Sequence, residues 1–149
     1  MSDGELVIQA PSGLEQVRAL MTRSPRPPMI EALDFNLVEV EKGLVVFEGR
    51  PSRKVYNPLG TVHGGYAATL LDSACGCAVH TMLSAEQGYT TLELKVAYHK
   101  AMTAETGPVQ AEGRVLSIGR RTAFAEAKLT DAAGRLYASA TSTLLVFER

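Results

Sequence analysis

The sequence predicts an α+β domain in which a mostly antiparallel β-sheet wraps around one long central helix. Residues 64–83 place apolar side chains on nearly every face of a helix roughly 30 Å long, so this helix should be buried almost all round. The segments after it alternate apolar and polar residues with a period of two, which is typical of strands. Short turns join these segments, and short turns favour antiparallel pairing. A chain of 149 residues is long enough to bury one such core.

The N-terminal segment predicts a helix that packs on this domain. Residues 12–23 have apolar side chains at helical spacing, and Ser12 with Glu15 can form a capping box. The proline-rich run 25–28 ends the helix and starts an extended connector. We therefore assign residues 1–32 to an N-terminal helix and connector, and residues 33–149 to the domain itself.

The remaining elements follow from turn signals and periodicity. Residues 33–52 predict a hairpin that turns at 41–43, and residues 53–62 predict a loop before the long helix. Gly88 is expected in the loop after that helix. Four further strands are predicted, at residues 90–98, 108–118, 121–130 and 135–147.

Composition excludes several classes of protein. With 15 basic and 16 acidic residues the net charge is −1, which disfavours nucleic acid and anionic membranes as partners. Two cysteines are too few for a disulfide framework, and free thiols fit a reducing cytoplasm. The N-terminus lacks the pattern of a secretory signal, and the apolar run 66–83 is broken by Asp72, Ser73 and His80. We expect a cytoplasmic protein.

Asp72 is the chemically unusual residue of the long helix. It is the only carboxylate between Glu48 and Glu86, and it lies between Leu71 and Ser73 in the middle of an apolar helix. Aspartate is a poor residue for a helix interior, and burying its charge costs several kcal/mol unless donors or water compensate. Asp72 is therefore a candidate catalytic group, with a structural carboxylate bonded to a neighbouring loop as the alternative.

Two glycines open the same helix and predict an oxyanion site. Gly64 and Gly65 leave backbone N–H groups uncovered where the helix dipole is positive, although a tight turn explains such a pair as well. Gly65 and Asp72 are seven residues apart, on one side of the helix and about 10 Å apart along its axis. That distance is too long for both to hold one carbonyl group. The spacing therefore predicts a dimer whose site is shared between two chains.

One sequence pattern joins these residues to the preceding loop: Asn57-Pro58-x-Gly60, followed by His63-Gly64-Gly65-x6-Asp72. With the buried helix and four strands that follow, this pattern resembles the hotdog-fold acyl-CoA thioesterases, and most of all their phenylacetate-degradation (PaaI-like) group. The resemblance covers about residues 33–147. It implies a hotdog fold and hydrolysis of acyl-CoA thioesters to free acid and coenzyme A.

The resemblance also implies roles for individual residues. Asp72 corresponds to the helix carboxylate that acts as general base or nucleophile at the thioester carbon. Gly65 corresponds to the residue whose backbone N–H polarises the thioester oxygen. His63 corresponds to a histidine that mostly shapes this turn, and a catalytic base is the alternative. Asn57 corresponds to a loop residue that helps to orient the substrate or the attacking water.

Thr91, on the strand after the helix, corresponds in this resemblance to a hydroxyl that holds the water or the carboxylate. Thr90 takes that place if the strand register differs by one residue. Water attack assisted by Asp72 and direct attack by its carboxylate, through a mixed anhydride, both remain open. Two other functions also remain open, namely an enoyl-CoA hydratase or dehydratase and a non-catalytic acyl-CoA-binding protein.

The remaining candidate residues concern substrate binding. Arg120 and Arg121 belong to the densest positive segment, and they form either a solvated turn or a clamp for the phosphates of coenzyme A. Tyr66, beside Gly64 and Gly65, either lines an acyl pocket or packs in the core. The histidines and cysteines show no metal-ligand spacing, so we expect no metal. No cofactor is expected either, since coenzyme A enters with the substrate.

A homo-oligomer is expected from the shape of the fold. A sheet wrapped around one helix leaves an unpaired edge and an outer face to cover. We therefore expect at least a dimer, and a homotetramer built as a dimer of dimers.

Overall fold

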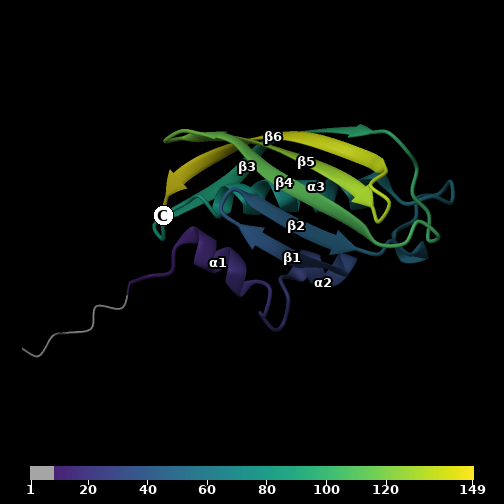
Figure 1. Ribbon diagram of the computed structural model, residues 1–149, viewed down its shortest axis with the longest axis horizontal. Helices are drawn as coiled ribbons and strands as arrows, with labels where there is room; N and C mark the ends of the chain where they lie inside the picture. Colours follow the sequence, from purple (N-terminus) through teal and green to yellow (C-terminus); the bar gives the residue numbers. More distant parts are fainter. Residues whose placement is uncertain (1–8) are drawn as a thin grey trace, which may run out of the picture.

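The computed structural model describes residues 9–149 and confirms the predicted α+β architecture (Figure 1). Six strands form one antiparallel sheet in the order β1-β2-β4-β5-β6-β3. The sheet packs around the long helix α3 (Gly64–His80), which contacts β2 to β6. The strands are β1 (Phe35–Glu41), β2 (Leu44–Gly49), β3 (Gln87–Tyr98), β4 (Val109–Ile118), β5 (Thr122–Asp131) and β6 (Leu136–Glu148).

The core lies between α3 and the inner face of the sheet. Leu70 and Leu71 of α3 are fully buried, and alternate residues of β5 meet them from the sheet. Gly113 of β4 lies so close to α3 that a Cβ there would collide with the carbonyl of Ala74. The helix therefore approaches the sheet at backbone distance, as its many small residues allow.

Two short helices lie on the side of β1, as Figure 1 shows: α1 (Gly13–Ala19) and α2 (Pro28–Leu33). The capping box of Ser12 and Glu15 is confirmed, but α1 ends at Ala19, earlier than the predicted residue 23. The backbone N–H of Gly13 donates to the carbonyl of Leu83 at 3.0 Å, which ties α1 to the chain after α3. The first eight residues of segment 1–32, where we sought a secretory signal, lie outside the described residues.

Three further predictions of local structure were wrong. The connector after Pro25 contains α2, because proline is well tolerated in the first turn of a helix. The long helix ends at His80 rather than at residue 83. The next residue, Thr81, is the C-cap, and its hydroxyl donates a hydrogen bond to the Ala78 carbonyl. Gly88 lies inside β3 rather than in a loop, and a Cβ there would lie 2.8 Å from the ring of Phe147.

Strands β1 and β3 form the two edges of the sheet. β3 has 12 residues, and its large apolar side chains include Leu92 and Tyr98, both more than half exposed. Loop 50–63, which contains a 3-10 turn (Arg53–Val55), leads from β2 to the start of α3. Within residues 9–149, no helix is both long and apolar enough to cross a membrane.

Candidate active site

The carboxylate of Asp72 lies against β3 and is oriented by Thr91. The Thr91 hydroxyl donates a hydrogen bond of 2.9 Å to Asp72 Oδ1. Both side chains are half-buried, whereas Thr90 is exposed. Since side chains alternate along a strand, only one of these two threonines can face the helix, and here it is Thr91. The other carboxylate oxygen of Asp72 has no hydrogen-bond partner within residues 9–149, so it is free to contact a further group.

The backbone of β3 is irregular at this point. Pairing with β6 shifts register between Thr91 and Glu93, which leaves Leu92 at a bulge. Bulges of this kind are common beside active sites because they re-aim a side chain. The bulge therefore follows directly after Thr91, which is still paired with Leu144 of β6.

The start of α3 holds the predicted oxyanion donor, and that donor is already bonded. His63 is the N-cap, and its Nδ1 accepts the backbone N–H of Gly65 at 2.7 Å. A substrate oxygen that uses the Gly65 N–H must take the place of this nitrogen. The imidazole is exposed and can turn away without disturbing the core.

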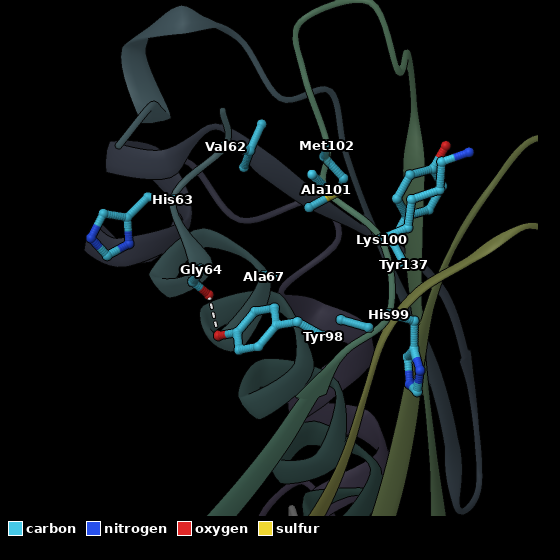
Figure 2. A pocket seen from close by; sticks show the side chains of 11 residues that line it. Val62, His63, Gly64, Ala67, Tyr98, His99, Lys100, Ala101, Met102 and Tyr137 are labelled. Carbon is cyan, nitrogen blue, oxygen red and sulfur yellow. Dashed lines mark hydrogen bonds between the residues drawn. The ribbon is translucent and has the colours of Figure 1, made fainter. Parts of the chain in front are cut away.

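The end of β3 is tied to the same helix start. The Tyr98 hydroxyl donates to the carbonyl of Gly64 at 2.7 Å (Figure 2). A Cβ at position 64 would lie 3.0 Å from that hydroxyl oxygen, and a Cβ at position 65 would lie 2.9 Å from His63 Nδ1. The two glycines therefore leave space for the side chains of His63 and Tyr98 at the start of α3. The contact of Tyr98 was not predicted from the sequence.

Asn57 organises the loop before the helix. Its Oδ1 accepts the backbone N–H groups of Leu59 and Thr61, at 3.0 and 3.1 Å, and its Nδ2 donates to Thr61 Oγ1 at 2.9 Å. Both ends of the amide are used inside the loop. A direct contact of Asn57 with substrate or water requires the loss of one of these bonds.

One chain does not bring the predicted residues together. Gly65 lies at the start of α3 and Asp72 lies about two turns further on, roughly 10 Å along the axis. The two therefore do not line a single cleft within one chain. A second chain that placed its own α3 start beside Asp72 would complete each site.

A groove lies beside the α3 start (Figure 2). It has a volume of about 330 Å³ and lies between α3, the end of β3 and the start of β6. Its lining is mostly apolar, with one ammonium group, Lys100 Nζ, 5.9 Å from the ring centroid of Tyr137. Sequence reasoning missed Lys100 and Tyr137, because only the fold brings the two segments together.

Arg120 and Arg121 lie far from the helix start in the same chain. They are exposed in the turn between β4 and β5, beside a hollow of about 450 Å³ that the end of β6 lines. Thr91 and Ala123 both pair with Leu144, so this turn lies near the Asp72 end of the sheet. The arginines thus lie at the Asp72 end of the sheet, and their phosphate role stays a prediction.

Tyr66 faces the core rather than the groove of Figure 2. Its side chain is only 3% exposed, and burial, with a smaller effect of Asp34, raises its pKa to about 12. Tyr66 packs in the core cluster and also lines a second cavity, so both roles considered for it stay predictions. Its hydroxyl, however, has no hydrogen-bond partner within residues 9–149.

The cysteines near Asp72 are poor nucleophiles at neutral pH. Burial raises the pKa of both Cys75 and Cys77 to about 12, and the negative charge of Asp72 adds to the effect. Within residues 9–149, no three His, Cys, Asp or Glu side chains gather closely enough to hold a metal ion. Among these side chains, the carboxylate of Asp72 is thus the group suited to act as a base or a nucleophile at neutral pH.

Comparison with known proteins identifies relatives of one kind. A family model described as the thioesterase superfamily matches residues 59–138. The 1,4-dihydroxy-2-naphthoyl-CoA hydrolase of Listeria monocytogenes is 29% identical over 116 residues, which is 78% of this chain and 93% of that protein.

Many solved structures share the fold, and two of them are 26% and 28% identical to this chain. A thioesterase family protein from Silicibacter pomeroyi has a TM-score of 0.81 and 26% identity, over 93% of this chain and 100% of that one. A Streptococcus mutans protein solved with acetyl CoA bound has a TM-score of 0.70 and 28% identity, over 77% of this chain and 90% of that one. The wrapped helix and sheet described above are therefore those of the hotdog thioesterases.

Proposed function

The chain belongs to the thioesterase superfamily and is a thioester hydrolase, and on that premise we propose that it hydrolyses acyl-CoA thioesters with Asp72 as the reacting carboxylate. The observation that carries this proposal is the hydrogen bond from Thr91 to Asp72. It fixes one carboxylate oxygen and leaves the other free, half-buried on a helix that has no other carboxylate.

In the water route, a water molecule lies between the free oxygen of Asp72 and the hydroxyl oxygen of Thr91. Asp72 takes a proton as the water oxygen attacks the thioester carbon, and negative charge develops on the carbonyl oxygen. The backbone N–H of Gly65 from a second subunit stabilises that charge once His63 has moved aside. The C–S bond then breaks, the thiolate takes the proton from Asp72, and free acid and coenzyme A leave.

In the second route the carboxylate itself attacks the thioester. The thiolate leaves first, and a mixed anhydride with Asp72 remains until water hydrolyses it. The two routes differ in the fate of oxygen atoms. In a single turnover in ¹⁸O-labelled water, hydrolysis of the anhydride at the Asp72 carbonyl leaves the label on Asp72, which the water route never does, and mass spectrometry of the active-site peptide detects it. Trapping of the anhydride by hydroxylamine in rapid-quench samples identifies the second route when water attacks the acyl carbonyl instead.

We propose that the active enzyme is at least a dimer, and a homotetramer in its complete form. The unpaired edge of β3 lies next to Asp72 and carries exposed apolar side chains such as Leu92 and Tyr98. A second chain at this edge covers those groups and brings its own α3 start towards Asp72. Sedimentation measurements test the oligomeric state.

The coenzyme A part of the proposal rests on two relatives: the Listeria protein is named a CoA hydrolase, and the Streptococcus protein was solved with acetyl CoA. The groove of Figure 2 and the Arg120–Arg121 turn are the surfaces we assign to the coenzyme. The reaction needs no cofactor, because coenzyme A arrives as part of the substrate. Two free, buried thiols agree with the cytoplasm as its location.

A panel of acyl-CoA thioesters, with the released thiol detected by a disulfide reagent, tests the proposal. We expect turnover that Asp72→Asn lowers by two orders of magnitude or more, while circular dichroism stays unchanged. Near-normal turnover in Asp72→Asn would remove Asp72 from the reaction. Hydration of crotonyl-CoA without thiol release, or tight binding without turnover, would favour a hydratase or a binding protein instead.

A further inference from the structure

The hydroxyl of Tyr66 is the one buried side-chain polar atom that has no hydrogen-bond partner within residues 9–149. An unsatisfied buried hydroxyl destabilises the folded protein, and phenylalanine would fill the same space without that cost. Burial keeps the hydroxyl protonated, so it offers a hydrogen-bond donor and not a charge. A bound ligand that accepts a hydrogen bond from this hydroxyl would explain why tyrosine and not phenylalanine occupies the position.

Tyr66 lines a cavity of about 660 Å³ between α2, the chain that follows β2, and the α3 start. Leu33, Val55 and Ala104 supply apolar walls. Gly49 lies directly behind the hydroxyl, and a Cβ at that position would collide with it. The absence of a side chain at Gly49 therefore leaves the space that the hydroxyl occupies.

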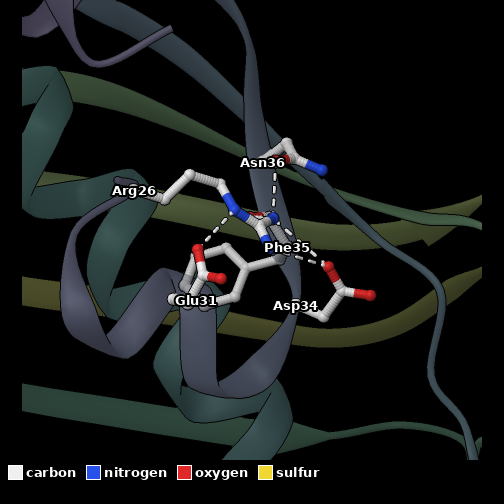
Figure 3. Close-up of polar contacts among 5 residues, drawn as sticks. All are labelled: Arg26, Glu31, Asp34, Phe35 and Asn36. Atoms are coloured by element: carbon white, nitrogen blue, oxygen red, sulfur yellow. Dashed lines mark hydrogen bonds and ion pairs between the residues drawn. The ribbon is translucent and has the colours of Figure 1, made fainter. Parts of the chain in front are cut away.

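Charged groups surround the cavity in an uneven way. Its acidic side chains, Glu31 and Asp34, both bond to Arg26, at 3.0 and 3.2 Å (Figure 3). The basic side chains Arg50 and Lys54 have no ion-pair partner within residues 9–149. The charged groups left open around the cavity are therefore two exposed cations, whereas the Tyr66 hydroxyl, also a donor, is closed off in this arrangement.

The outer wall of the cavity is formed by α2, which has no fully buried residue but packs Ile30 and Leu33 against the core. Arg26 links it to β1, because its guanidinium bonds both to Glu31 of α2 and, at 2.8 Å, to Asn36 of β1 (Figure 3). The Tyr66 hydroxyl is closed off from water in this arrangement, so a bond from it to a ligand requires α2 to shift outward.

The cavity is within reach of the proposed reacting centre. Tyr66 follows Gly65 directly, so its hydroxyl lies within about 10 Å of the Gly65 backbone N–H by standard bond lengths. That N–H is the donor assigned to the thioester oxygen. An acyl chain of about six carbons therefore spans the distance between the two donors.

We propose that this cavity receives the acyl group, and that the Tyr66 hydroxyl donates a hydrogen bond to an oxygen atom at the far end of that group. The inference rests on the proposed function and adds a substrate class to it, namely acyl groups with a distal oxygen acceptor. Tyr66 is then a specificity-determining residue. A site built to bond a polar group discriminates strongly against the analogue that lacks it.

Three thioesters of equal chain length test this: hexanoyl-CoA, 5-oxohexanoyl-CoA and adipoyl-CoA. We expect the wild type to favour at least one of the oxygen-bearing substrates in kcat/KM, and Tyr66→Phe to lower that preference about tenfold or more. Preference for the oxo compound indicates a neutral acceptor. Preference for adipoyl-CoA that falls in Lys54→Gln as well indicates a carboxylate. A preference that survives in Tyr66→Phe, or its absence in the wild type, overturns the inference.

Stability gives a second, independent readout. Tyr66→Phe should unfold at the same or a higher urea concentration than the wild type, because it removes an unsatisfied group. Tyr56→Phe is the matched control, since the Tyr56 hydroxyl accepts the Ala104 N–H at 2.8 Å, and this variant should be less stable. A destabilised Tyr66→Phe contradicts the inference. The absence of thiol release from every thioester instead contradicts the proposed function.

Discussion

Thr91 Oγ1 donates a 2.9 Å hydrogen bond to Asp72 Oδ1, and this contact joins the central helix to an edge strand of the sheet. An edge strand has one side free for a second chain, so the carboxylate lies where two subunits can meet. The chemistry and the assembly of the protein are thereby linked at one side-chain contact.

Thr91→Val should lower kcat about 10- to 100-fold and change KM little. The substitution keeps the shape of the side chain but removes the hydroxyl that orients Asp72, and small misplacements of a reacting group cost this much. Thr90→Val is the control, because Thr90 is adjacent but exposed. If both variants behave alike in steady-state assays with acyl-CoA, the orienting role of Thr91 is wrong.

Substitutions of His63 distinguish a role in helix capping from a role in proton transfer. His63→Ala should lose about 1 kcal/mol of stability in urea unfolding, because Gly65 N–H loses its acceptor. His63→Asn should restore most of that stability, since asparagine is a good N-cap. If the histidine only caps, His63→Asn also keeps most of the turnover. A loss of turnover as large as that of Asp72→Asn would instead make His63 a catalytic base.

The free energy of unfolding should decrease as the pH is lowered, because protonation of His80 is less favourable in the folded protein. Burial, and secondarily the positive charge of Arg149, lowers the pKa of His80 below its usual 6.5. The ring packs against Tyr89, and its Nε2 lies 3.0 Å from Gln16 Oε1, which Arg149 also binds. The unfolded chain therefore takes up this proton more readily than the folded protein does. The stability that neutral His80 contributes is complete above the unfolded pKa and is lost as pH falls through the lower folded pKa.

Urea unfolding at a series of pH values from about 7.5 to about 5 measures this effect. The free energy of unfolding should decrease over that range in the wild type and decrease less in His80→Gln. Identical pH profiles for the two proteins would show that His80 does not carry the effect.

Much of the fold follows from the sequence because its signals are local. The period of two identifies the strands after α3, and the continuous apolar surface identifies α3 itself. Gly88 was misplaced because glycine also occurs where another group approaches closely, here the Phe147 ring, and only tertiary structure reveals such an approach. α2 was missed because prolines that break one helix can begin the next.

The site was predictable in part. Asp72 stands out in any reading, as a lone acid in an apolar helix, and the alternation of β3 selects Thr91 over Thr90 once the register is known. The occupied N–H of Gly65 was not predictable, since the rotamer of His63 is a tertiary property. The unpartnered hydroxyl of Tyr66 also leaves no trace in the sequence, where it looks like any core tyrosine.

Arg120 and Arg121 provide the test of how coenzyme A is bound. Both are exposed in the turn between β4 and β5, and arginine pairs well with phosphate. Replacing both with Glu should raise KM for an acyl-CoA about tenfold or more, because two cations become two anions beside the phosphates. The same acyl group on pantetheine, which has no nucleotide, should show little change in KM.

Added salt should weaken acyl-CoA binding in the wild type and much less in the variant, because salt screens exposed charges. Equal effects on the two thioesters would show that these arginines do not contact phosphate. Arg114→Glu controls for a general change of surface charge, because Arg114 is an exposed cation earlier on β4 that is paired with Glu112.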